Sequence, residues 1–132
     1  MGRNRTFDEA EVVAACASAF RSTGYEGTSI DDLVRASGLH RGSLYKAFGS
    51  KRGLFLQALG QIADSGSGDD DSTDLLLVAL MELAPRDAEI GAIVSTILAH
   101  SRPQHTAASL GARLLNRAGL TTPDHTPPKD TP

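Results

Sequence analysis

Three short segments with helical spacing of apolar residues follow one another between residues 9 and 48. Apolar residues three or four positions apart lie on one face of a helix, so each segment predicts an amphipathic helix. Gly24 and Gly38 separate the segments, and glycine commonly ends a helix because it adopts the left-handed conformation without strain. The chain must therefore begin as a bundle of short helices connected by tight turns.

The first helix is predicted over residues 9–23. Asp8 and Glu11 have the spacing of a capping box, in which each side chain accepts a hydrogen bond from the other residue's amide. Phe7 and Val12 stand where a hydrophobic staple requires them. The apolar stripe that follows consists of Val12, Val13, Cys16, Ala19 and Phe20.

The next two helices are shorter and closely connected. Ser29 is the predicted cap of the second helix, with Asp32 as its capping-box partner, and Gly38 ends this helix. A third helix is predicted over residues 41–47, with Leu44 directed toward the core. Two short helices joined by a glycine-containing turn are typical of the helix-turn-helix motif. Ser50 is the predicted cap of a fourth helix, whose apolar positions are Leu54, Phe55, Ala58, Leu59 and Ile62.

The second half of the chain predicts a short helical unit. Residues 64–72 are acidic and rich in Gly and Ser, which favours a flexible loop. Helices are predicted over 74–84, 87–100 and 105–118, with Pro85 and Pro103 between them and Gly119 in a Schellman turn at the end. Residues 121–132 contain four prolines and predict a disordered tail. The predicted fold is all-α, with a helix-turn-helix domain at 1–53, a helical domain at 54–120 and the tail.

Charge is unevenly divided along the chain of 132 residues, which carries a formal net charge of −3. Residues 1–53 contain eight Lys/Arg and six Asp/Glu, whereas residues 54–132 contain five and ten. A more basic end is expected where a chain meets a polyanion such as nucleic acid.

Other classes of function find no support in the sequence. No apolar stretch reaches the roughly 18 to 20 residues of a membrane span, and no apolar export segment follows the N-terminus, so we expect a cytoplasmic protein. The single cysteine, Cys16, lies on an apolar stripe and is expected to be a buried hydrophobe. The four histidines lack zinc-site spacing, and no catalytic or nucleotide-binding motif is present. We expect no enzyme activity, catalytic residue, metal or cofactor.

The segment from Gly24 to Lys51 strongly resembles the DNA-binding domain of TetR-type regulators. The resemblance rests on Gly-Tyr-x-x-Thr-Ser-Ile at 24–30 and Gly-Leu-x-x-Gly-x-Leu-Tyr-x-x-Phe-x-Ser-Lys at 38–51. It covers roughly residues 8–60 and implies a transcriptional regulator, more often a repressor than an activator. Many family members carry a histidine or second aromatic residue before the Phe, where this chain has Lys46 and Ala47. The operator sequence therefore cannot be carried over from relatives.

The third helix is the predicted recognition helix, which should face the major groove of DNA. Arg41 and Lys46 can donate to guanine, and Tyr45 can contact a sugar or a thymine methyl group. Gly42 lets the start of the helix approach DNA closely. The hydroxyls of Thr28, Ser29 and Ser43 suit phosphate oxygens, although capping alone accounts for Ser29. The complete predicted DNA-binding set is Thr28, Ser29, His40, Arg41, Gly42, Ser43, Tyr45, Lys46 and Lys51.

Two further assignments stay open at this point. Lys51 follows the Ser50 cap, where a phosphate could meet its ammonium, and the family resemblance supports this role. Arg3 and Arg5 precede the first helix and could follow the DNA backbone or enter the minor groove, with a solvated tail as the alternative.

The predicted partners are double-stranded DNA and a second copy of the chain. The helix around Leu75–Leu83 is apolar nearly all round, and the next two helices carry apolar stripes at 90–98 and 110–118. Three short helices should not bury all of this surface alone, so we expect a homodimer. The family resemblance implies a small-molecule effector, but the short second half leaves open whether a pocket exists, and its ligand residues are unknown. If present, it should be lined by helices around 54–62, 74–84 and 90–99. A second hypothesis is an interaction module that has lost DNA binding and forms heterodimers with a related regulator.

Overall fold

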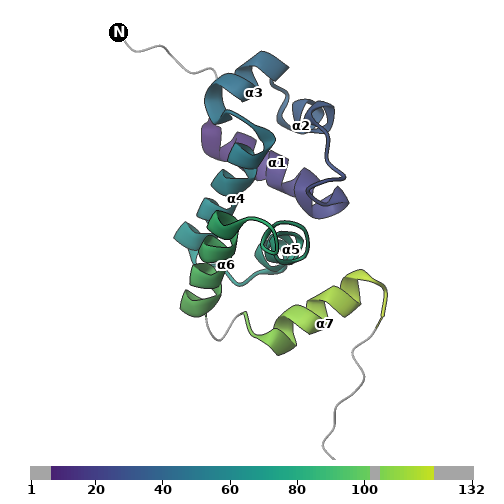
Figure 1. Cartoon of the computed structure of the whole chain (residues 1–132). Coiled ribbons are helices and arrows are strands. Elements are labelled where there is room, and N and C mark those ends of the chain that lie inside the picture. The colour runs from purple at the N-terminus through teal and green to yellow at the C-terminus, as the bar shows by residue number, and fades with distance from the viewer. Residues whose placement is uncertain (1–6, 102–104, 121–132) are drawn as a thin grey trace, which may run out of the picture.

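The computed structural model describes residues 7–101 and 105–120, and these residues form helices and their connections only (Figure 1). The elements are α1 (Glu9–Thr23), α2 (Ile30–Ser37), α3 (Arg41–Phe48), α4 (Lys51–Ser65), α5 (Asp70–Val78), the π-helix η1 (Ala79–Leu83), α6 (Ala88–His100) and α7 (Ala107–Arg117). No strand occurs within the described ranges, and the predicted all-α class is confirmed. Pro103, Arg3, Arg5 and the predicted tail at 121–132 lie outside them.

The N-terminal helices begin at the predicted caps. Asp8 caps α1, but its carboxylate accepts from the Ala10 amide at 2.9 Å, so the predicted partner, Glu11, was wrong. Ser29 and Asp32 form the predicted capping box, because the Ser29 hydroxyl accepts from the Asp32 amide at 3.0 Å and the Asp32 carboxylate accepts from the Ser29 amide at 2.8 Å. Ser50 caps α4 by accepting from the Gly53 amide at 2.9 Å.

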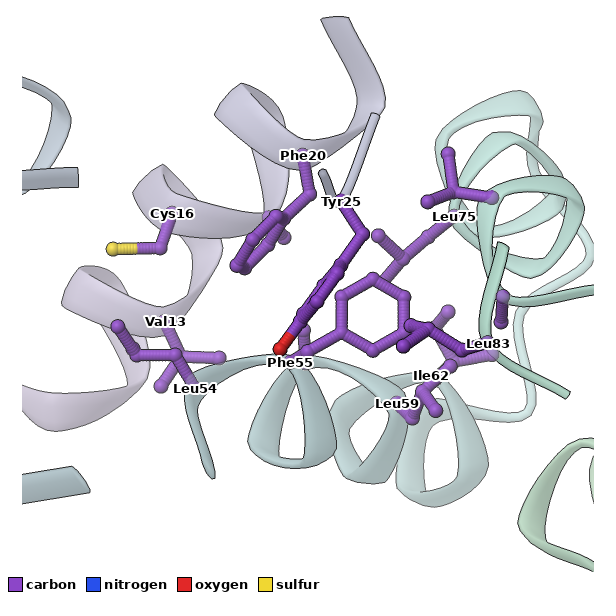
Figure 2. Packing of buried hydrophobic residues seen from close by; sticks show 14 of the residues in the cluster. Val13, Cys16, Phe20, Tyr25, Leu54, Phe55, Leu59, Ile62, Leu75 and Leu83 are labelled. Atoms are coloured by element: carbon purple, nitrogen blue, oxygen red, sulfur yellow. The ribbon is translucent and has the colours of Figure 1, made fainter. Parts of the chain in front are cut away.

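One apolar cluster connects the N-terminal helices to α4, α5, η1 and α6. At its centre, the ring of Tyr25 stacks on Phe20 with centroids 5.7 Å apart and meets Phe55 edge-on at 5.3 Å (Figure 2). Cys16 is buried in the same cluster, and burial raises the pKa of its thiol to about 11, as expected for an unreactive apolar residue. The predicted positions of α4 from Leu54 to Ile62 are all buried.

The predicted acidic loop at 64–72 is largely wrong. Residues up to Ser65 belong to α4, and α5 already begins at Asp70, so the connection is only residues 66–69. Asp69 caps α5 by accepting from the Ser72 amide at 2.8 Å, and acidic side chains in a first turn favourably face the positive end of the helix dipole. The carboxylates thus start a helix, although their density in the sequence indicated a loop.

Buried Asp74 explains how this acidic helix is held inside the molecule. Arg113 of α7 donates to both carboxylate oxygens of Asp74 at 2.7 and 2.9 Å, and Arg117 lies 2.9 Å away. Burial alone raises the pKa of Asp74, but the hydrogen bonds and positive charges of the two arginines outweigh it and lower the pKa below its usual value. This ion-pair cluster attaches α7 to α5.

The apolar run at 75–83 is largely covered within one chain. The residues Leu75, Leu76, Leu77, Val78, Ala79 and Leu83 are buried, against α1, α4, α6 and α7. Leu80 is half-buried and Met81 is exposed. In α7, by contrast, no residue is buried, and Leu114 is exposed, as is Leu120 just after the helix. Apolar surface therefore remains on α7 rather than on α5.

Two predicted chain reversals agree with the structure. Pro85 lies between η1 and α6, and the predicted Schellman turn is present after α7. There the Leu120 amide donates to the Leu115 carbonyl at 2.8 Å and the Gly119 amide to the Asn116 carbonyl at 3.0 Å. None of the helices in the described ranges is both long and apolar enough to span a bilayer.

Candidate nucleic-acid interface

Helices α2 and α3 lie at one end of the molecule and α7 at the other (Figure 1). Gly38 adopts the left-handed conformation at φ 74° and ends α2, and three residues later α3 begins. Leu33 of α2 and Leu44 of α3 are buried, whereas Phe48 is half-buried against the core. These anchors determine which side of α3 points away from the protein.

The outward side of α3 carries the residues predicted to contact bases. Arg41, Gly42 and Lys46 are exposed, and Tyr45 has 44% of its surface exposed, which is unusual for a large aromatic residue. His40 precedes the helix as its N-cap, is exposed, and makes no side-chain capping bond. The structure thus brings these five residues onto one exposed helix and its start.

Two arginines near this surface are paired with aspartates of α2. Arg41 donates to Asp31 across the turn between the two helices, and Arg35 donates to Asp32 within α2. Both arginines remain more than half exposed. Because guanidinium has five N–H donors, Arg41 keeps donors for a base while one carboxylate holds it in place.

The predicted phosphate contacts are placed less uniformly. Thr28 is fully buried, with its hydroxyl 2.6 Å from the Thr23 hydroxyl and from the Gly24 carbonyl, so its side chain does not lie on the surface. The phosphate contact predicted for the Thr28 hydroxyl does not fit this burial, because the hydroxyl forms hydrogen bonds inside the turn between α1 and α2. Ser29 is exposed but acts as a cap, and Ser43 is half-buried on α3.

Lys51 binds the backbone of the turn between α1 and α2, a structural role that the sequence did not indicate. Its ammonium donates to the carbonyls of Tyr25 at 3.0 Å and Thr28 at 3.1 Å, and lies 4.4 Å from the centroid of the Tyr25 ring. An ammonium has three donors, so one N–H is left for a phosphate. The phosphate contact of Lys51 stays a prediction, beside an observed role in holding the turn.

Sequence reasoning missed the polar contacts that join the N-terminal helices to the second half. Arg52 of α4 donates to both oxygens of Asp87 at 2.8 and 3.1 Å and to Glu89 at 2.6 Å. The hydrogen bonds from Arg52 and from the Ile90 amide lower the pKa of Asp87 to about 2. Glu82 of η1 accepts from the amides of Tyr25 and Glu26. Sequence separations of 35 to 57 residues give no periodic signal for such pairs.

An α2 anchored in the core by Leu33, a glycine turn and an outward α3 with basic and aromatic residues define a helix-turn-helix protein. Residues 12–58 match the family described as "Bacterial regulatory proteins, tetR family". This segment, and with it the DNA-binding part of the chain, belongs to the TetR family of helix-turn-helix regulators.

Three regulators show the extent of the similarity. The chain is 49% identical over 59 residues to the uncharacterized HTH-type transcriptional regulator YezE of Bacillus subtilis, a match that covers 45% of this chain and 30% of that protein. It is 31% identical over 98 residues to the HTH-type transcriptional repressor BdcR of Escherichia coli, covering 68% of this chain and 50% of the repressor. It is 38% identical over 63 residues to the repressor ComR of Escherichia coli, covering 48% and 30%.

The matched stretches thus span half or less of each of these relatives. No solved structure matches the chain.

Proposed function

We propose that this protein is a sequence-specific DNA-binding repressor that recognises a palindromic operator as a homodimer. The observation that carries the proposal is the outward side of α3, where Arg41, Tyr45 and Lys46 are exposed around Gly42. In the proposed division, residues 1–53 bind DNA and residues 54–120 dimerise. Both BdcR and ComR are named as repressors, which supports repression as the outcome of binding.

Gly42 supports an external partner because none of the residues that the structure describes requires a glycine there. It lies within α3, and a Cβ added to it would meet no atom within 4 Å. Glycine inside a helix costs about 1 kcal/mol relative to alanine. A close approach by DNA would explain this otherwise unfavourable choice, since the missing side chain lets the helix start enter the groove.

The proposed dimer would use the exposed apolar side chains of the second half. Leu114 of α7 and Leu120 have 42% and 57% of their surface exposed, and Met81 has 62%. Two copies whose recognition helices lie one DNA turn apart would read a two-fold symmetric site, and their binding free energies would combine.

We further propose that a small-molecule effector controls DNA binding, and two cavities support this part of the proposal. A cavity of about 320 Å³ lies between α1, α4 and α5, with Ala14, Ala17, Ala58, Ile62 and Leu75 in its apolar wall. A second cavity of about 250 Å³ lies between the ends of α4 and α6. The sequence predicted one pocket lined by α4, α5 and α6 together. Neither cavity has this lining, because α1 takes the place of α6 in the larger cavity and α5 does not reach the smaller one.

A footprint on DNA flanking the protein's own gene, together with the mass in solution, tests the proposal. We expect a protected palindrome, a dimer mass and affinity that falls steeply with salt, because phosphate contacts release counterions. Lys46→Ala should relax base preference at one position of each half-site, whereas the exposed Arg86→Ala in the second half serves as a control and should bind like the parent. A stable dimer without salt-sensitive DNA binding would contradict the proposal and favour the heterodimerising interaction module.

A further inference from the structure

Glu82 makes two hydrogen bonds to a part of the chain more than fifty residues away. One carboxylate oxygen accepts from the Tyr25 amide at 3.0 Å, and the other accepts from the Glu26 amide at 2.9 Å. Both amides belong to the α1–α2 turn, defined here as residues 24–28, which leads directly into the Ser29 cap of α2. A single side chain of the second half therefore holds the segment that introduces the helix-turn-helix.

Lys51 binds the same turn through its carbonyl groups, whereas Glu82 binds it through its amides. The Lys51 ammonium donates to the carbonyls of Tyr25 and Thr28. Tyr25 is thus bound through its N–H by Glu82 and through its C=O by Lys51. The Tyr25 ring is buried against Phe20 and Phe55 (Figure 2). Tyr25 is therefore bound through its ring, its amide and its carbonyl.

Glu82 lies in a π-helix, which affects the direction in which its side chain points. Residues 79–83 form a π-helix, closed by a hydrogen bond from the Ala84 amide to the Ala79 carbonyl at 2.8 Å. A π-helical turn inserts one residue into an α-helix and rotates the side chains that follow, and such turns occur frequently at functional sites. In η1 the neighbouring Met81 is exposed while Glu82 reaches the turn.

Gly24 shows that the approach of Glu82 is close. A Cβ at Gly24 would lie 2.6 Å from a carboxylate oxygen of Glu82, and the φ of 83° at Gly24 also disfavours other residues. Glycine at position 24 therefore permits the Glu82 carboxylate to approach the amides of the turn.

We propose that Glu82 is a positioning residue through which the second half of the chain sets the orientation of α2 and α3. This inference rests on the proposed function, because the orientation matters for a pair of recognition helices that must match two half-sites. Arg52 with Asp87 joins α4 to α6, but Glu82 contacts the backbone immediately before α2 itself. A shift of η1 would therefore change how the two recognition helices are presented to DNA.

The test compares Glu82→Ala and Glu82→Gln with the parent in the full-length chain. Glutamine keeps one acceptor oxygen but places an NH₂ group against the second amide, whereas alanine removes both acceptors. Asp64→Asn is the matched control, since it removes an exposed carboxylate near the end of α4, away from the α1–α2 turn. The measurements are amide hydrogen exchange at Tyr25 and Glu26, residual dipolar couplings of α2 and α3 relative to α5 and α6, and affinity for specific and random-sequence DNA.

We expect exchange at the two amides to rise about tenfold and the couplings of α2 and α3 to change relative to α5 and α6. Specific affinity should fall about tenfold, a typical size for coupling between sites. Random-sequence affinity should change less than about twofold, because phosphate contacts tolerate small rotations. The glutamine variant should lie between alanine and parent, and Asp64→Asn should match the parent.

Unchanged couplings in a folded Glu82→Gln protein would overturn the inference, even if the two amides exchange faster. A parallel fall in specific and random-sequence affinity would also overturn it, because that result indicates partial unfolding. If the parent itself does not distinguish specific from random DNA, the proposed function fails, and the couplings alone still decide whether Glu82 orients the two helices.

Discussion

Replacing Lys51 by methionine separates its observed structural role from its predicted phosphate contact. Methionine keeps the apolar stem of the side chain and removes the ammonium. The change deletes two hydrogen bonds to the carbonyls of Tyr25 and Thr28, 3.0 and 3.1 Å long, and the cation–π contact with the Tyr25 ring at 4.4 Å.

The expected loss of stability follows from these contacts. Hydrogen bonds to charged groups contribute roughly 1.5–3 kcal/mol each, and a half-exposed cation–π pair contributes about 0.5–1 kcal/mol. Lys51 is half-buried, so water can replace part of what is lost, and the side chain regains rotational freedom. We therefore expect the free energy of unfolding to fall by about 2 kcal/mol, which is below the gross range of roughly 3.5–7 kcal/mol for the three contacts.

Urea unfolding followed by circular dichroism measures this loss, and circular dichroism suits a chain that has no Trp. Lys46→Met is the matched control, because Lys46 is exposed on α3 and its replacement should change stability by less than about 0.5 kcal/mol. The salt dependence of DNA binding by Lys51→Met then shows whether the third N–H also meets a phosphate, in which case the slope should fall by about one. A stability change below about 0.5 kcal/mol for Lys51→Met would refute the reasoning from its two hydrogen bonds.

Three other substitutions probe the second half and α4 by the same unfolding assay. Asp74→Asn should lower stability by about 2–3 kcal/mol, less than for a fully buried pair because its arginine partners are about a third exposed; a neutral result would contradict a role of the cluster in holding α7. Burial lowers the pKa of His105, against an opposing effect of Asp69, so the unfolded chain binds its proton more readily. Stability should therefore be complete above about pH 6.5 and fall as the pH drops below that value, and His105→Gln should flatten this dependence; an unchanged pH profile would contradict it. Gly60→Ala within α4 should stabilise by about 0.5–1 kcal/mol, since its Cβ would meet nothing within 4 Å, and destabilisation would show that the open space is needed.

Local chemistry made much of the N-terminal region predictable. The boundaries of α1, the caps at Asp8, Ser29 and Ser50, and the glycine stops depend on residues within four positions of one another. The same holds for the outward side of α3, because Leu44 and Phe48 determine which residues face away from the core. Periodicity reports such short-range relations directly.

The second half shows where local signals mislead. Asp69, Asp70 and Asp71 indicated a loop, yet Asp69 caps a helix, and Asp74 of the same helix is buried against Arg113 and Arg117. Local composition cannot show that arginines about forty residues later neutralise a carboxylate. For the same reason local signals did not show that α1 and α4, together with α6 and α7, cover the apolar run at 75–83.

By itself, the sequence determined that the chain is all-α and that a helix-turn-helix exposes Arg41, Gly42, Tyr45 and Lys46, because each of these outcomes depends on side chains close in sequence. Only the tertiary structure decided the roles of Thr28, Lys51 and Glu82. The Thr28 hydroxyl is buried, and both charged side chains bind the backbone of the α1–α2 turn from elements far along the chain. Backbone N–H and C=O groups are the same in every sequence, so the partner of a distant charge becomes visible only when the helices are packed together.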